Sequence, residues 1–157
     1  MTATEKEQPP SPIPWPPLLF VAALVVGRAL DHFAPGPAFQ SSLLEMIGVV
    51  VIALALANDV WCALILRHHR TTVLPHRAVS AMVTTGPYRR SRNPIYISEL
   101  ALTLGLALLL GSFWIALSTP LLFLALTKLA IEPEERHLRA KFGAQFEAYA
   151  ARTPRWL

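Results

Sequence analysis

The stretch that decides the fold is residues 43–66, LLEMIGVVVIALALANDVWCALIL, an apolar run with no lysine or arginine. A run of this length can cross a bilayer as one α-helix, since a span needs about 20 predominantly apolar residues. Three further apolar runs lie at residues 15–33, 95–110 and 113–131. The run at 95–110 is short for a span, and its flanks or a locally thinned bilayer would accommodate it. The sequence therefore predicts four transmembrane helices.

The composition also favours a bilayer over water as the solvent. Of the 157 residues, 54% are hydrophobic and 15% are charged, whereas a typical soluble domain has about 25% charged residues. We expect an all-α integral membrane protein in which residues 15–157 form one domain. Residues 1–14, which are rich in proline and polar residues, are predicted to be a disordered lead. The first apolar run lacks a strongly basic lead and a small-residue cleavage site, so it is interpreted as a retained span.

Lysines and arginines gather in two segments, and this sets the expected orientation. Between residues 29 and 66, and again between 93 and 127, there are none. The link between the second and third runs holds Arg67, Arg70, Arg77, Arg89, Arg90 and Arg92, and the C-terminal tail holds Arg136, Arg139, Lys141, Arg152 and Arg155. The positive-inside rule places both segments in the cytoplasm, and with four spans the N-terminus is cytoplasmic too. We therefore expect an inner-membrane protein with both termini in the cytoplasm.

The net charge of +4 is explained by this topology and by anionic lipid headgroups. No soluble basic module remains for nucleic acid, so membrane lipids are the expected partners. Cys62 is the single cysteine, which excludes a disulfide framework and a CxxC metal site. His68, His69 and His76 do not have the spacing of a metal site, and we expect no metal.

A polar, conformationally stiff stretch, GPYRRSRNPIY, occupies residues 86–96 before the third run. Asn93 is a favoured helix N-cap and Pro94 suits the first helical turn, so this stretch is predicted to end where the third span begins. The positive end of that helix and the arginines before it would stabilise an anion such as a carboxylate or phosphate. Anchoring to lipid headgroups is the alternative role for any single arginine.

The tail after the fourth run predicts a cytoplasmic amphipathic helix over residues 133–151. Pro133 suits its first turn, and Leu138, Phe142, Phe146 and Tyr149 recur on one face. Glu132, Glu134 and Glu135 either cap this helix and keep it soluble or form the wall of a polar pocket.

Asn58, Asp59 and Glu99 are polar residues that fall within the predicted spans. Ionisable groups at such depth usually face a cavity or a partner. Arg28 and Asp31 are three residues apart and are expected to pair on one helix face.

Two stretches in this order, TTGPYRRSRNPIYIS at residues 84–98 and EPEERHLRAKFGAQFEAYAARTPRWL at 132–157, are separated by one helical hairpin. With them, residues 67–157 resemble the isoprenylcysteine carboxyl methyltransferase family and are similar to the related phospholipid N-methyltransferases. The resemblance implies an integral-membrane methyltransferase that uses S-adenosylmethionine (SAM). It also implies a lipophilic small-molecule or lipidated substrate that enters sideways between the spans.

The resemblance also implies which residues form the site. The cofactor-binding positions are His76, Gly86, Pro87, Tyr88, Arg92, Asn93, Pro94, Tyr96, Glu134, Glu135, His137 and Leu138. Catalysis is assigned to Arg92, Glu99 and Glu135, and substrate binding to Glu99, Tyr149 and Arg152. Asn93 stands where eukaryotic members commonly have histidine. Ser98 and Glu99 stand where glycine is frequent, which puts a carboxylate near the substrate side.

Several functions stay open at the level of sequence. O-methylation of an isoprenylcysteine-like carboxylate is favoured, and N- or S-methylation of a phospholipid or another small molecule is the nearest alternative. A nicotinamide-dependent reductase-like relative and a non-catalytic membrane adaptor are the remaining hypotheses. For an amine acceptor, Glu99 or a glutamate of the tail would serve as the base.

Overall fold

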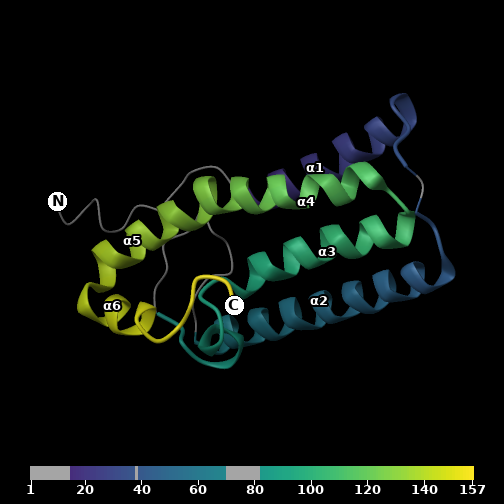
Figure 1. The fold of residues 1–157 in the computed structure, drawn as a ribbon. Coiled ribbons are helices and arrows are strands. Elements are labelled where there is room, and N and C mark those ends of the chain that lie inside the picture. Colours follow the sequence, from purple (N-terminus) through teal and green to yellow (C-terminus); the bar gives the residue numbers. More distant parts are fainter. Residues whose placement is uncertain (1–14, 38, 70–81) are drawn as a thin grey trace.

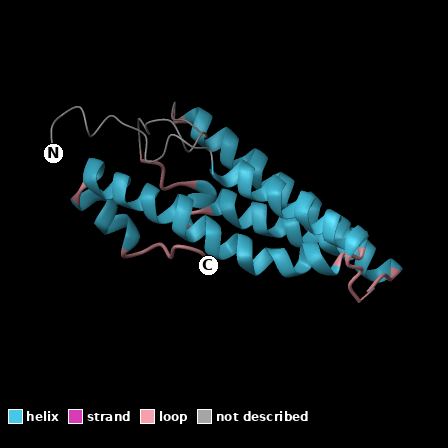
Figure 2. Ribbon diagram, turned by 90° about the horizontal axis from the view of Figure 1, so that it is seen from above, coloured by secondary structure: helices cyan, strands magenta, loops and turns pink. Residues whose placement is uncertain are grey.

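The structure is a computed structural model that describes residues 15–37, 39–69 and 82–157. Within these residues it consists of helices and loops without a β-strand (Figure 2). The helices are α1 (Trp15–Phe33), α2 (Ser42–His68), α3 (Pro94–Leu110), α4 (Phe113–Leu126), α5 (Glu132–Phe142) and α6 (Ala144–Ala150). A short 3₁₀ turn, η2 (Gly86–Arg89), precedes α3, and a π-helical turn, η3 (Thr127–Ile131), joins α4 to α5.

The four long helices form a bundle in which α2 packs along α3 and α1 packs along α4 (Figure 1). Helix α3 also contacts α4, so it lies between α2 and α4. Serine hydroxyls start two of the helices: Ser41 Oγ accepts from the Leu44 amide at 3.2 Å, and Ser112 Oγ accepts from the Ile115 amide at 3.1 Å. Gly111 ends α3 in the left-handed conformation at φ 60°, which allows the tight turn into α4.

Close backbone contact fixes α2 against α3. A Cβ on Gly48 would lie 2.7 Å from the carbonyl oxygen of Gly105, and a Cβ on Gly105 would lie 2.8 Å from Ile52 Cγ1. Small residues that let backbones approach are the usual means of helix packing in a bilayer, where apolar burial gives little drive between helices.

Large apolar side chains cover the outside of the bundle as well as its interior. Leu54, Val60 and Leu64 on α2 and Leu121 and Leu124 on α4 are all more than half exposed. Three helices are long and apolar enough to cross a membrane, namely Trp15–Phe33, Ser42–His68 and the continuous helix Phe113–Phe142. The third expected span, which is α3, is a shorter apolar helix of 17 residues.

The tail differs from its prediction in two respects. The single helix expected over 133–151 is two helices, because Gly143 has φ 51° and interrupts the helical backbone between α5 and α6. Pro133 does not begin a new helix either: α4, η3 and α5 run on as one helix. Since proline removes a backbone donor and crowds the preceding turn, the wide π-turn directly before it accommodates Pro133 without a break.

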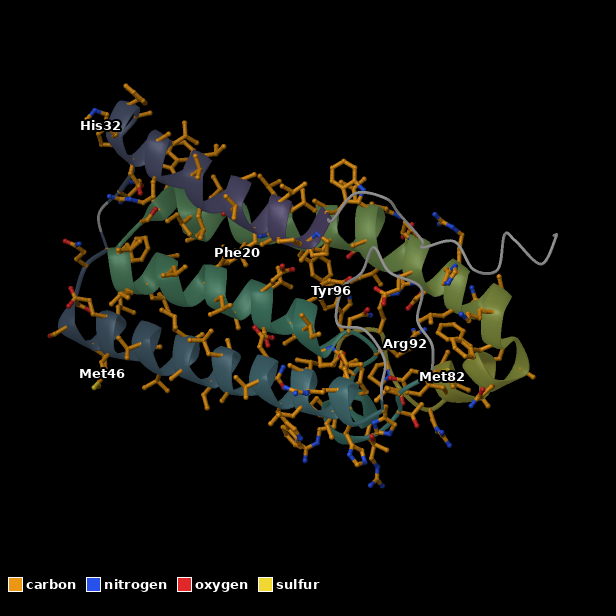
Figure 3. All side chains as sticks on the ribbon, turned by 180° about the vertical axis from the view of Figure 1, so that it is seen from behind. Phe20, His32, Met46, Met82, Arg92 and Tyr96 are labelled. Atoms are coloured by element: carbon orange, nitrogen blue, oxygen red, sulfur yellow. The ribbon has the colours of Figure 1, made fainter. Side chains whose placement is uncertain are left out.

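At the end of the bundle where α1 finishes, polar contacts join α1 to the turn between α3 and α4. Asp31 pairs with Arg28 at 3.0 Å, as expected, and also accepts from Ser112 Oγ at 2.6 Å. Trp114 Nε1 donates to the carbonyl of Ala34 at 2.6 Å. His32 and Met46 mark this end in Figure 3, whereas Arg92 and Met82 mark the opposite end.

Replacing Gly48 with valine should destabilise the protein by about 1–3 kcal/mol, because the added atoms meet the α3 backbone. The unfolding midpoint of the detergent-solubilised protein measures this. Ala53→Val adds two methyl groups to the exposed face of the same helix and is the control. Equal midpoints for the two variants would contradict close α2–α3 packing.

Candidate functional site

The candidate site lies at the end of the bundle where α2 finishes and α3 begins. Tyr96 and Arg92 mark it in Figure 3, on the side that faces α5 and α6. It is built from η2, the start of α3, helix α5 and the C-terminal strap, which is the name used here for residues 153–157. Most of the residues assigned from the sequence fall in these elements.

The turn η2 is held rigidly against α2. Gly86 has φ 60°, and a Cβ there would lie 3.1 Å from Ile65 Cγ1. Backbone hydrogen bonds then close the turn, from Tyr88 N to Thr85 O at 3.2 Å and from Arg90 N to Pro87 O at 3.0 Å. The need for glycine is thus both conformational and steric, and the turn positions the tyrosine and arginine that follow it.

Pro94 is the first residue of α3 and Asn93 occupies the N-cap position, but the asparagine side chain does not cap the helix. The prediction that the third span begins here is confirmed, although the Asn93 side chain makes no capping hydrogen bond. Its Nδ2 donates instead to the carbonyl of Arg155 at 2.9 Å, and its backbone N–H donates to Ser91 Oγ at 3.1 Å. The amide is turned toward the C-terminal strap because that strap passes directly over the start of α3.

Glu135 is the most strongly engaged carboxylate of the described residues. Its Oε1 lies 3.0 Å from Arg92 Nη1 and accepts from Arg155 Nε at 3.1 Å, while its Oε2 accepts from Arg155 Nη2 at 2.6 Å. The Glu135 side chain is only 8% exposed. Hydrogen bonding to this carboxylate raises the pKa of Arg155. Glu135 is thus satisfied by two guanidinium groups of the protein itself, and Arg92 Nε remains buried without a partner among the described residues.

The C-terminal strap closes over the loop before α3, as its yellow trace beside the teal segment shows (Figure 1). The amide of Arg92 donates to the carbonyl of Pro154 at 2.9 Å, and Ser91 Oγ donates to the carbonyl of Arg155 at 3.3 Å. The ring of Trp156 packs on Phe123 of α4 with centroids 4.7 Å apart. These contacts make the strap one wall of the site.

Three tyrosines line the interior of this end. Tyr96 Oη donates to Glu134 Oε2 at 3.0 Å, which links α3 to α5, and Tyr149 Oη donates to the carbonyl of Tyr88 at 2.6 Å, which links α6 to η2. Burial raises the pKa of Tyr149 to about 12 and raises that of Tyr88 as well. These two phenols therefore stay protonated at neutral pH.

Polar side chains on α2 and α3 continue the site into the bundle. Asn58 Nδ2 donates to Ser98 Oγ at 2.8 Å and to the carbonyl of Pro94 at 3.0 Å. Asp59 Oδ1 and Glu99 Oε2 are shielded from solvent and have no hydrogen-bond partner among the described residues. A carboxylate oxygen shielded from solvent without a partner is costly, and such groups commonly meet water, an ion or a ligand.

The remaining predicted residues are more scattered. His137 Nε2 is buried and has no partner within the described part of the chain, and Leu138 beside it is partly buried. Arg152 lines a separate cavity, which is described below. His76 lies outside the described residues. Among those that are described, no group of three or more His, Cys, Asp or Glu side chains could hold a metal ion.

Sequence reasoning missed how the site is held together. Ser91 and Ser98 are almost fully buried, and Arg155 serves as the second partner of Glu135. Small hydroxyl residues carry no distinctive sequence signal. Sequence spacing also does not reveal that Glu135 pairs both with Arg92 and with Arg155, which is 20 residues away. The surplus of arginines in the loop and the tail was the available signal for Arg155.

Residues 44–145 match the phospholipid methyltransferase family, which is more than half of the chain. The chain belongs to this family, and its three long apolar helices agree with a membrane protein. The family assignment agrees with the motifs at residues 84–98 and 132–157.

Two curated bacterial proteins are similar to the chain. The nickel-cobalt-cadmium resistance protein NccN of Alcaligenes xylosoxydans is 29% identical over 85% of this chain and 59% of its own length. The cobalt-zinc-cadmium resistance protein CzcN of Cupriavidus metallidurans is 32% identical over 73% of this chain and 49% of its own length. The chain thus matches about half the length of these relatives. No solved structure matches it.

Replacing Glu135 with glutamine should lower the free energy of unfolding by about 3 kcal/mol, because two guanidinium groups lose their buried counter-charge. Glu147→Gln is the matched control, since Glu147 pairs with Arg139 at an exposed position where an ion pair is worth about 0–1 kcal/mol. Thermal unfolding in detergent compares the two. A Glu135 variant as stable as the Glu147 variant would show that the bridge does not hold the site together.

Proposed function

We propose that this chain is a SAM-dependent methyltransferase that acts at the cytoplasmic face of the inner membrane on a lipophilic acceptor. The observation that carries the proposal is the set of unsatisfied polar atoms at one end of the bundle. Arg92 Nε, Asp59 Oδ1 and Glu99 Oε2 are buried without described partners. They lie in a chain whose family transfers methyl groups.

In the proposed topology the chain crosses the membrane four times, and the short helix α3 makes the third crossing. At 17 residues α3 is at the lower limit of length for a span, and its tight turn into α4 leaves no room for a longer connection. The arginines and lysines of the loop before α3 and of the tail favour the cytoplasm for this end. The candidate site then lies at the cytoplasmic interface, where a soluble cofactor and a lipid can meet.

The polar side chains of the candidate site fit SAM, which combines a carboxylate with an ammonium and a sulfonium. Arg92 Nε is a buried donor suited to the carboxylate, and Glu134 is a partly buried acceptor held only by Tyr96 among the described residues. The tyrosine rings offer faces to a cation or to adenine. When bound, SAM would supply an electrophilic methyl group. The protein's residues would bind the cofactor, orient it toward the spans and keep water out.

Glu135 receives a different role from the one expected. Because its two oxygens already accept from Arg92 and Arg155, it is proposed to position Arg92 instead of binding the cofactor or taking part in catalysis. The hydrogen bond between Tyr149 and the carbonyl of Tyr88 likewise supports a positioning role for Tyr149.

The carboxylates of Asp59 and Glu99 favour one chemical class of methyl acceptor. Asp59 and Glu99 each have one carboxylate oxygen that is shielded from solvent and has no described hydrogen-bond partner. A carboxylate acceptor brought beside them would meet like charge, whereas an ammonium would be attracted. This favours N-methylation of a lipophilic amine over the isoprenylcysteine-like O-methylation expected from the resemblance. Glu99 would accept the ammonium proton and so free the nitrogen lone pair, and the new N–CH₃ bond would form as the S–CH₃ bond of SAM breaks and S-adenosylhomocysteine leaves.

Cofactor binding is tested by titrating the detergent-purified protein with S-adenosylhomocysteine in a calorimeter, with NADPH as the comparison ligand. S-adenosylhomocysteine should bind and NADPH should not. Glu134→Gln should weaken that binding about tenfold, the value of one charge-assisted hydrogen bond. Glu132→Gln is the control, because Glu132 pairs with exposed Lys128 on the same helical stretch. Binding of NADPH alone would favour a reductase-like relative, and binding of neither ligand by folded protein would favour an adaptor.

The acceptor is tested by incubating membranes that contain the protein with methyl-labelled SAM. An amine product should keep its label in mild alkali, whereas a methyl ester should release it as methanol. We expect alkali-stable label in the lipid fraction, reduced by Glu99→Gln at least 100-fold if Glu99 is the base. Label that alkali releases would instead identify a carboxylate acceptor.

A further inference from the structure

A cavity of about 450 Å³ opens beside η2 and the end of α6, and its described lining residues are Thr84, Arg89, Arg152 and Thr153. None of these residues belongs to the group formed by Tyr96, Glu134, Asp59 and Glu99. The turn η2 and the strap border both places, and the resemblance assigned Arg152 to substrate binding, but the proposed methyl transfer gives none of these four residues a role.

The fold brings its two arginines together from distant parts of the chain. Tyr149 Oη donates to the carbonyl of Tyr88 at 2.6 Å and so joins the end of α6 to η2. Arg89 follows Tyr88 directly, and the amide of Arg152 donates to the carbonyl of Tyr149 at 3.2 Å. Each arginine is thus anchored by its backbone beside the same buried phenol.

The cavity carries positive charge, and no described carboxylate neutralises it. Arg28, Arg92, Arg139 and Arg155 all pair with carboxylates, but neither Arg89 nor Arg152 forms an ion pair with a described residue. The described lining contains no carboxylate, and the two threonines add hydroxyl groups. Two guanidinium groups with nearby hydroxyls suit a tetrahedral, multiply accepting anion, since planar guanidinium forks match phosphate geometry.

We propose that this cavity is a phosphate-binding site, separate from the site of methyl transfer. The phosphate comes either from the headgroup of an anionic lipid in the facing leaflet or from a soluble phosphate compound. The cavity is large enough for a glycerophosphate headgroup. An occupied site would link η2 and the C-terminal strap through their shared ligand, because Arg89 comes from the turn and Thr153 from the strap.

Native mass spectrometry of the detergent-purified protein tests the proposal with three probes: phosphatidylglycerol, diacylglycerol and sodium phosphate. Phosphatidylglycerol should be retained and diacylglycerol, which lacks the phosphate, should not. Competition by millimolar sodium phosphate would assign the site to soluble phosphates, and its failure to compete would assign the site to lipid headgroups. Failure of both phosphatidylglycerol and sodium phosphate to bind would overturn the proposal.

The variants Arg89→Gln and Arg152→Gln should each weaken phosphatidylglycerol binding about tenfold. Arg136→Gln makes the same change at an exposed arginine of α5 outside the described cavity lining and should leave binding unchanged. An equal loss in all three variants would indicate diffuse attraction to positive charge and overturn the proposal, as would undiminished binding in the double variant. Neither outcome depends on methyl transfer, because no probe is methylated in the assay.

Discussion

The carboxylate of Glu135 accepts hydrogen bonds from Arg155 and pairs with Arg92, so one side chain of α5 joins the loop before α3 to the C-terminal strap. The three charges lose most of their water, and their mutual attraction has to offset that desolvation. The gain is geometric, since three segments far apart in sequence are held in one arrangement. The positions of Tyr96, Glu134 and the unsatisfied Arg92 Nε all depend on it.

The bilayer explains why polar contacts gather at the two ends of the bundle. Along its length, α2 and α3 meet through glycine, and apolar side chains face outward. Packing of this kind sets the distance between the helices but supplies no polar side chains for binding or catalysis. The chemistry is therefore supplied at the ends, and in this protein one end carries nearly all of the tyrosines, arginines and glutamates assigned to function.

The sequence allowed the apolar helices to be predicted because length and composition alone define a run that can cross a bilayer. The runs at 15–33 and 95–110 lie over α1 and α3 almost to the residue. The loop and tail motifs also directed attention to one end of the bundle, where the structure places most of the described residues assigned to the site. The hydrogen-bond pairings could not be predicted from the sequence, since the side-chain amide of Asn93 donates to a backbone carbonyl 62 residues away. Asn93 does occupy the N-cap position that its local preference favours, but a tertiary contact engages its side chain in place of a capping hydrogen bond.

The π-turn at Thr127–Ile131 has a consequence for how α5 is aimed. A π-turn acts as a one-residue insertion, and each residue of an α-helix advances its face by about 100°. Every side chain after Ile131 is therefore re-phased relative to α4. Glu134 and Glu135 face α3 and the strap because of this added residue, whereas uninterrupted α-helical periodicity from α4 would direct them elsewhere. The register of the acidic pair is thus set inside the last turns of the apolar helix, before the polar tail begins.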